Sequence, residues 1–224
     1  MPSEAGGSSS AGLETLSDLV VRLRRQLNSL RGVADRQAII IAANAAADAI
    51  EARVDPAAPV LTETERAALV AAQALTFNAA ADCWPGWEIA PDKAAVSRVD
   101  LQGGLDLARR SFAMVQRLRS GALREGTAHW MVGAYQLALG QIDDAVSLLS
   151  LSVVRYQDAR APGLAWLARG YIAIAYETAN QSRPDAVATF DEVLVAIETG
   201  GFEDAAEWRE QLNIARRVFT RHAG

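Results

Sequence analysis

Long stretches of this chain repeat apolar residues every three or four positions, and few prolines interrupt them. Only 7 of the 224 residues are proline, and 50% of the chain is hydrophobic. The segment 13–30 is typical, since Leu16, Leu19, Leu23 and Leu27 form one stripe along a helix. Proline is the residue least compatible with a helix interior, so its scarcity favours long helices. We therefore predict an all-α fold without strands.

Prolines, glycines and capping residues divide the chain into segments. Residues 1–11 form a Ser/Gly-rich flexible tail, and residues 12–54 form an N-terminal helical hairpin. Two prolines mark a linker at 55–59, because proline disfavours helix at the residue before it. After the linker, Thr62 and Glu65 have the spacing of a capping box, which predicts the start of a third helix.

The expected helices cover most of the chain. They span 13–30, 34–54, 62–83, 105–118, 123–139, 143–156, 164–178, 185–198 and 203–221, and a shorter helix starts near residue 91. The pair Gly103-Gly104 is expected to interrupt that shorter helix, and Pro184 fits the first turn of the helix at 185–198. Residues 61–224 form one helical region, which the polar last helix caps.

Three of these helices share one spacing. A small residue is followed four positions later by a bulky residue and seven positions later by a third residue of the pattern. The copies are Ala108, Phe112 and Val115; Ala145, Leu149 and Ser152; and Ala186, Phe190 and Val193. In a helical hairpin, the small residue lies where the two backbones nearly touch, and the bulky residue fills the space beyond. The helix before each later copy carries a tryptophan and a glycine, namely Trp130 with Gly133 and Trp166 with Gly170.

This pattern resembles the tetratricopeptide-repeat (TPR) family, whose unit is a helix–turn–helix of about 34 residues. Gly133 and Ala145 stand at the family's twelve-residue step, and Trp166 and Gly170 stand at its four-residue step. The units are degenerate, since Arg169 replaces the family's leucine. The resemblance implies a solenoid of stacked antiparallel helical hairpins, wound as a right-handed superhelix, that serves as a protein–protein interaction scaffold. The alternative is an alanine-rich helical bundle without repeats.

The helices that would line the inner surface of such an array are unusually apolar. The segment 129–139 carries no acidic or arginine side chain, and the segment 164–176 carries Arg169 as its single charge. A helix that is apolar all round is buried all round, so something must cover its second side. We expect this cover to be the helix at 34–54, which would fold back over the inner helices. A second copy of the chain is the second choice, and an apolar small molecule is the third.

Six residues are candidates for contact with a partner. Arg169 either extends its charge to solvent or receives a carboxylate from a peptide, with Tyr171 and Tyr176 as neighbouring hydrogen-bonding aromatics. His129 is a further candidate on the inner helices. Trp84 and Trp87 lie in a loop and either form an exposed anchor or dock the loop onto the core.

Charge and composition exclude several classes of protein. The net charge is −5, and the arginines at 109, 110, 117, 119 and 124 have no interleaved aromatic residues, so we expect a solvated helix face and no nucleic-acid partner. No apolar run approaches the roughly 20 residues that span a bilayer, and the N-terminal residues lack the pattern of a signal peptide. Cys83 is the single cysteine, so no disulfide can form within the chain. We expect a cytoplasmic protein.

The motifs of the common enzyme classes are missing from the sequence. It contains no HExxH, CxxC, GxSxG or glycine-rich phosphate loop, and only two histidines. We therefore expect no catalysis, no cofactor and no metal, and a protein or peptide partner. Two alternatives stay open. One is a helical sensor or carrier that encloses an apolar small molecule between its inner helices, and the other is an enzyme that uses Cys83 or His129.

Overall fold

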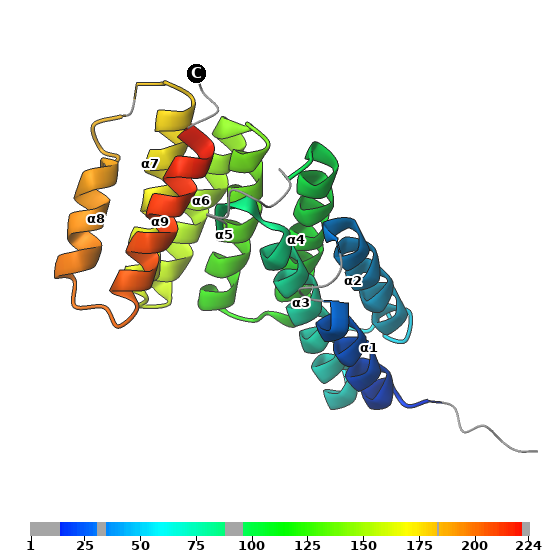
Figure 1. The fold of residues 1–224 in the computed structure, drawn as a ribbon. Helices are drawn as coiled ribbons and strands as arrows, with labels where there is room; N and C mark the ends of the chain where they lie inside the picture. The colour runs from blue at the N-terminus through cyan, green and yellow to red at the C-terminus, as the bar shows by residue number, and fades with distance from the viewer. Residues whose placement is uncertain (1–13, 31–34, 88–95, 183, 221–224) are drawn as a thin grey trace, which may run out of the picture.

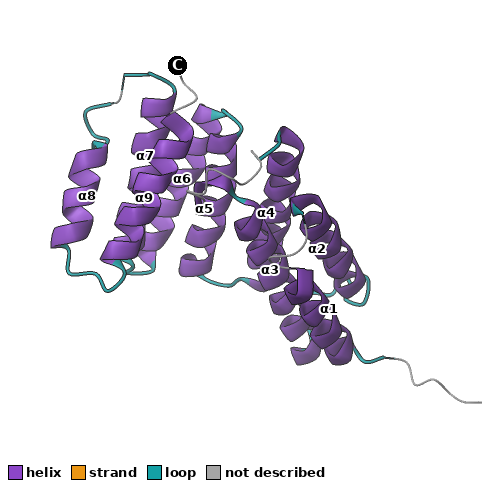
Figure 2. Cartoon of the chain, viewed as in Figure 1, coloured by secondary structure: helices purple, strands orange, loops and turns teal. Residues whose placement is uncertain are grey.

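The computed structural model describes residues 14–30, 35–182 except 88–95, and 184–220, and of Trp87 only the backbone. These residues form nine α-helices and one short 3₁₀ helix, with no strand among them (Figures 1 and 2). The elements are α1 (Leu16–Leu30), α2 (Arg36–Glu51), α3 (Glu63–Cys83), η1 (Pro85–Trp87), α4 (Arg98–Leu118), α5 (Ala122–Ala138), α6 (Ile142–Asp158), α7 (Pro162–Thr178), α8 (Phe190–Thr199) and α9 (Ala205–Thr220). The prediction of an all-α chain is confirmed.

Capping boxes fix the starts of three helices. The box at Thr62 and Glu65 is present as predicted and starts α3. A second box, at Ser97 and Asp100, starts α4, and a third, at Thr189 and Glu192, starts α8. In each box the N-cap side chain accepts a hydrogen bond from the third helical N–H, so the chain enters the helix at a defined residue.

Two expected boundaries are wrong. Gly103 and Gly104 do not interrupt a helix, because α4 runs through both, and a side chain at Gly104 would collide with Tyr135 of α5. These glycines therefore provide space between packed helices. The helix expected at 185–198 begins only at Phe190, because the capping box at Thr189 sets its start and the carbonyl of Pro184 instead accepts a hydrogen bond from Val187 in a turn.

Helices α4, α6 and α7 end in the same kind of turn, although none of them uses glycine there. A residue one or two positions after the helix lies in the left-handed region, at Arg119 (φ 50°), Arg160 (φ 55°) and Asn180 (φ 51°). The N–H of the following residue then donates to a carbonyl in the last turn, as Ser120 to Val115 (3.1 Å), Ala161 to Tyr156 (2.9 Å) and Gln181 to Tyr176 (3.2 Å). These bonds satisfy carbonyls that the helix itself leaves open.

Consecutive helices pack side by side along the chain, from α1 to α8, and α9 lies against α7, α8 and η1 (Figure 1). One hydrophobic core extends through this arrangement from Leu19 in α1 to Phe219 in α9. Within the described residues, no helix combines the length and the apolar character that crossing a bilayer requires.

Helices α5 and α6 pack closely against one another at Gly133. A side chain at Gly133 would lie 2.9 Å from the Leu149 side chain and 3.3 Å from the carbonyl oxygen of Ala145. The small-residue pairing that the sequence indicated is therefore present here. It does not recur at Gly170, which faces Leu212 of α9, because Ala186 precedes α8 and lies outside any helix.

Candidate functional site

Four aromatic side chains from distant parts of the chain form what we call the inner aromatic cluster. Trp84 lies directly after α3 and is only 1% exposed. Its ring lies 6.0 Å from that of Trp130 in α5, 5.5 Å from Tyr171 in α7 and 5.7 Å from Phe219 in α9, measured between centroids. A side chain at Gly86 would collide with the Trp84 ring, so only glycine lets the chain fold back over it.

The inner aromatic cluster shows what covers the apolar helices α5 and α7. The cover is the segment that carries Trp84, together with α9, whereas α2 packs mainly against α1, α3 and α4. The expectation that the helix at 34–54 folds back onto these helices is therefore wrong. Of the two alternatives for Trp84, the structure shows the docked one, so its side chain is not an exposed anchor. The side chain of Trp87 lies outside the described residues.

Tyr171 belongs to the same cluster and is 0% exposed. Its hydroxyl accepts a hydrogen bond of 2.9 Å from Nε2 of Gln211 in α9, and burial raises the pKa of this phenol well above its ordinary value. Burial disfavours the charged form of a phenol, so Tyr171 stays neutral. A partner therefore cannot reach it on the surface of the folded protein.

Arg169 and Tyr176 lie apart from the cluster. The guanidinium of Arg169 stacks on the ring of Trp166, 4.4 Å from its centroid, which agrees with an arginine that extends toward solvent. Tyr176 is half-buried and lines a small pocket of about 160 Å³ between α7 and the start of α8. The groove once expected around Arg169, Tyr171 and Tyr176 is therefore not formed by these three residues together.

His129 lies in a cleft of about 320 Å³ that we call the His129 cleft. The cleft is built from α4, α5 and α6, and its lining residues are Phe112, Gln116, Arg119, Gly121, Glu125, His129 and Arg155. The rings of Phe112 and His129 are in contact at 4.5 Å between centroids, tilted by 59° to one another, and both residues are half-buried. Gln116, Arg119 and Arg155 are exposed around them, so the cleft has an aromatic base and a polar rim.

Two charged neighbours act on His129. Arg155 forms an ion pair of 3.0 Å with Glu125 across the cleft. Burial lowers the pKa of His129 below its ordinary value, the positive charge of Arg155 lowers it further, and Glu125 opposes this change. The Nδ1 atom of His129 is buried and has no hydrogen-bond partner among the described residues. His129 is therefore neutral at pH 7 in the free protein.

This neutral histidine predicts a dependence of stability on pH. As the pH falls through the ordinary pKa of histidine, the unfolded chain binds a proton at His129 more readily than the folded protein does, so the free energy of unfolding should fall on acidification. We expect less than about 1 kcal/mol, because His129 is only partly buried. Denaturant titrations at several pH values would measure it. The variant H129Q should lose this part of the pH dependence, and an unchanged pH dependence in H129Q would contradict the prediction.

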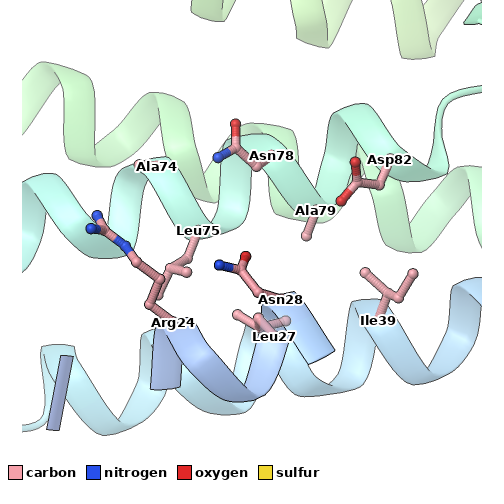
Figure 3. A pocket seen from close by; sticks show the side chains of 9 residues that line it. All are labelled: Arg24, Leu27, Asn28, Ile39, Ala74, Leu75, Asn78, Ala79 and Asp82. Atoms are coloured by element: carbon pink, nitrogen blue, oxygen red, sulfur yellow. The ribbon is translucent and has the colours of Figure 1, made fainter. Parts of the chain in front are cut away.

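A second groove, of about 240 Å³, lies between α1 and α3. Figure 3 shows Asn28 of α1 facing the helix that carries Asn78, with Arg24 and Asp82 toward opposite ends of the groove. Its base is apolar and includes Leu27 of α1. None of the residues that the sequence singled out lies in this groove, and it is smaller than the His129 cleft.

Cys83 and His129 have separate surroundings. Cys83 is buried at the end of α3, where its thiol donates to the carbonyl of Arg36 at 3.9 Å. His129 instead contacts Phe112 and the charges of the cleft. Among the described residues, the Cys83 thiol and the His129 imidazole are therefore not in the contact that would activate a nucleophile.

The residues that complete the His129 cleft were not found by sequence reasoning. Gln116 and Arg155 belong to no recognisable sequence motif. The sequence pattern places Arg119 among the arginines of a solvated helix face. The signal available in the sequence was weak, namely an arginine two residues before the glycine that precedes α5.

Comparison with known proteins found no protein similar to this chain. No family model, no curated protein and no solved structure matches it. The class that the structure itself defines is an all-helical protein of consecutively packed helices with a polar cleft across α4, α5 and α6.

Proposed function

We propose that this protein is a non-catalytic protein–protein interaction module, a TPR-like solenoid of stacked helical hairpins, and that its partner docks in the His129 cleft. The observation that carries the proposal is the cleft itself, which spans three consecutive helices and combines two aromatic rings in contact with exposed polar groups. Aromatic and arginine side chains are the residue types that dominate protein interfaces. The partner is a protein or peptide, and a cytoplasmic location agrees with the single reduced, buried cysteine.

Two features support a role in binding over the other candidates. The inner helices, between which an apolar small molecule would have to lie, are already packed around Trp84, and this argues against the sensor or carrier alternative. Cys83 is fully buried, and no nucleophile from the described part of the chain contacts His129, which argues against an enzyme. The α5–α6 hairpin, with Gly133 packed against Ala145 and Leu149, supports the TPR-like architecture.

Site-specific photo-crosslinking in cells of the source organism tests this function. A photo-reactive amino acid at Gln116, on the rim of the cleft, should give one discrete crosslinked species. The same amino acid at Gln102, which is also exposed and lies on the same helix about 20 Å away at 1.5 Å rise per residue, is the matched control and should not give that species. No adduct from Gln116, or the same adducts from both positions, would contradict the proposal.

A further inference from the structure

The His129 cleft carries one positive charge that no described residue neutralises by an ion pair. Arg155 is paired with Glu125 at 3.0 Å and with Asp158 at 3.3 Å. Arg119 lines the same cleft and is exposed, and it forms no ion pair with any described residue. A ligand group of opposite charge would therefore find Arg119 available without first breaking an ion pair.

The backbone holds Arg119 in place at the rim. This residue lies in the left-handed region, and its N–H donates to the carbonyl of Gln116 at 3.1 Å. The N–H of Ser120 donates to the carbonyl of Val115, also at 3.1 Å. Because the backbone here is already fixed by hydrogen bonds, it loses little further conformational entropy when a ligand binds. On α6, Leu151 is exposed and lies one helical turn before Arg155, outside the residues that line the cleft.

His129 responds to charge that enters the cleft. In the free protein, burial and Arg155 keep the pKa of His129 low. A negative group placed beside Arg119 would oppose Arg155 and favour the protonated imidazole, by the same Coulomb interaction that Glu125 already exerts. The other charged or titratable groups that face His129 from α4, α5 and α6 are Arg119, Glu125 and Arg155.

We propose that the His129 cleft binds a carboxylate of an acidic segment of the partner protein, between Arg119 and Arg155, and that His129 takes up a proton from solvent when this carboxylate binds. The proposal rests on the proposed function and adds the chemistry of the partner. A carboxylate carries one negative charge and matches the one unpaired arginine. A phosphate dianion would exceed this charge and would face Glu125 and Asp158.

Fluorescence anisotropy with a labelled peptide of alternating glutamate and leucine tests the proposal. The same peptide with glutamine in place of glutamate is the neutral probe. Arg119→Asn removes the charge and keeps a residue that tolerates the left-handed region. Arg160→Asn is the matched control, because Arg160 has the same backbone conformation and exposure but does not line the cleft.

We expect the acidic peptide to bind the natural protein and R160N alike, and R119N about tenfold more weakly. Affinity should rise by about fivefold from pH 8 to 5.5 in the natural protein, and not in H129Q, because histidine is the side chain that ordinarily titrates in this range. Circular dichroism and thermal melts would establish that all three variants are folded.

Several results would overturn the proposal. These are equal binding to R119N and R160N, equal affinity for the neutral peptide, competition by inorganic phosphate at lower concentration than by acetate, or an unchanged pH dependence in H129Q. The experiments also distinguish a failure of the proposed interaction function from a failure of the proposed acidic partner. A crosslink from Gln116 without acidic-peptide binding leaves the interaction function and removes the acidic partner. Acidic-peptide binding without a crosslink leaves the chemistry of the cleft and removes the interaction function.

Discussion

Replacing Trp84 by alanine should lower the free energy of unfolding by about 3–5 kcal/mol, the range for truncating a large buried aromatic side chain. Trp84 is 1% exposed, and its ring contacts aromatic side chains from α5, α7 and α9. Removal of the indole leaves a cavity between three helices that are fixed by other contacts, so the site cannot fully collapse. Urea titration followed by far-ultraviolet circular dichroism measures the loss.

Trp166→Ala is the matched control for this prediction. Trp166 is half-buried on α7, and its ring is partly covered by the guanidinium of Arg169. Its removal should cost much less than that of Trp84, and Trp84→Phe should retain part of the stability because a ring still fills the site. Equal losses of stability in W84A and W166A would contradict the prediction that the inner aromatic cluster stabilises the fold more than a partly exposed tryptophan does.

The second large effect is expected at Gly104. A methyl group at this position would collide with the ring of Tyr135, which is fully buried and whose hydroxyl donates to the carbonyl of Ala80 at 2.6 Å. Tyr135 cannot move away without breaking this hydrogen bond. We expect G104A to lose about 1–3 kcal/mol, even though alanine is favoured over glycine within a helix by about 1 kcal/mol.

The neighbouring glycine provides the control for G104A. A methyl group at Gly103 would lie 2.9 Å from the terminal carbon of Ile40, a flexible side chain that can change rotamer. G103A has the same gain in helix propensity and a smaller steric cost, so its stability should stay close to that of the natural protein. Thermal and urea unfolding of both variants measure the difference, and equal stability of G104A and G103A would contradict the account of Tyr135.

Local sequence patterns predicted where the helices lie more accurately than they predicted which helices contact one another. The apolar periodicity of α1 and the capping box at Thr62 depend on residues within a few positions of one another, and both are present in the structure. Gly103 and Gly104 were read as a break because a glycine pair usually ends a helix. Their actual role depends on Ile40 and Tyr135, which sequence spacing alone does not place beside them.

The candidate site was predicted only in part, for the same reason. His129 was named from the sequence, but its neighbours come from three helices. The arginines grouped as one solvated face have different surroundings. Arg110 pairs with Asp48 at 2.7 Å and Glu51 at 3.0 Å, whereas Arg119 lies at the cleft without an ion pair to any described residue. Net charge and periodicity do not distinguish a paired arginine from an unpaired one.

The contact between Trp84 and Phe219 has a consequence for the order of events during protein synthesis. Trp84 leaves the ribosome long before α9 does, so its indole cannot reach its final environment until the later helix has been translated. Until then the nascent chain presents an aromatic side chain to the cell's chaperones. Completion of the core is thus coupled to translation of α9, and contacts of such long sequence separation slow the last step of folding.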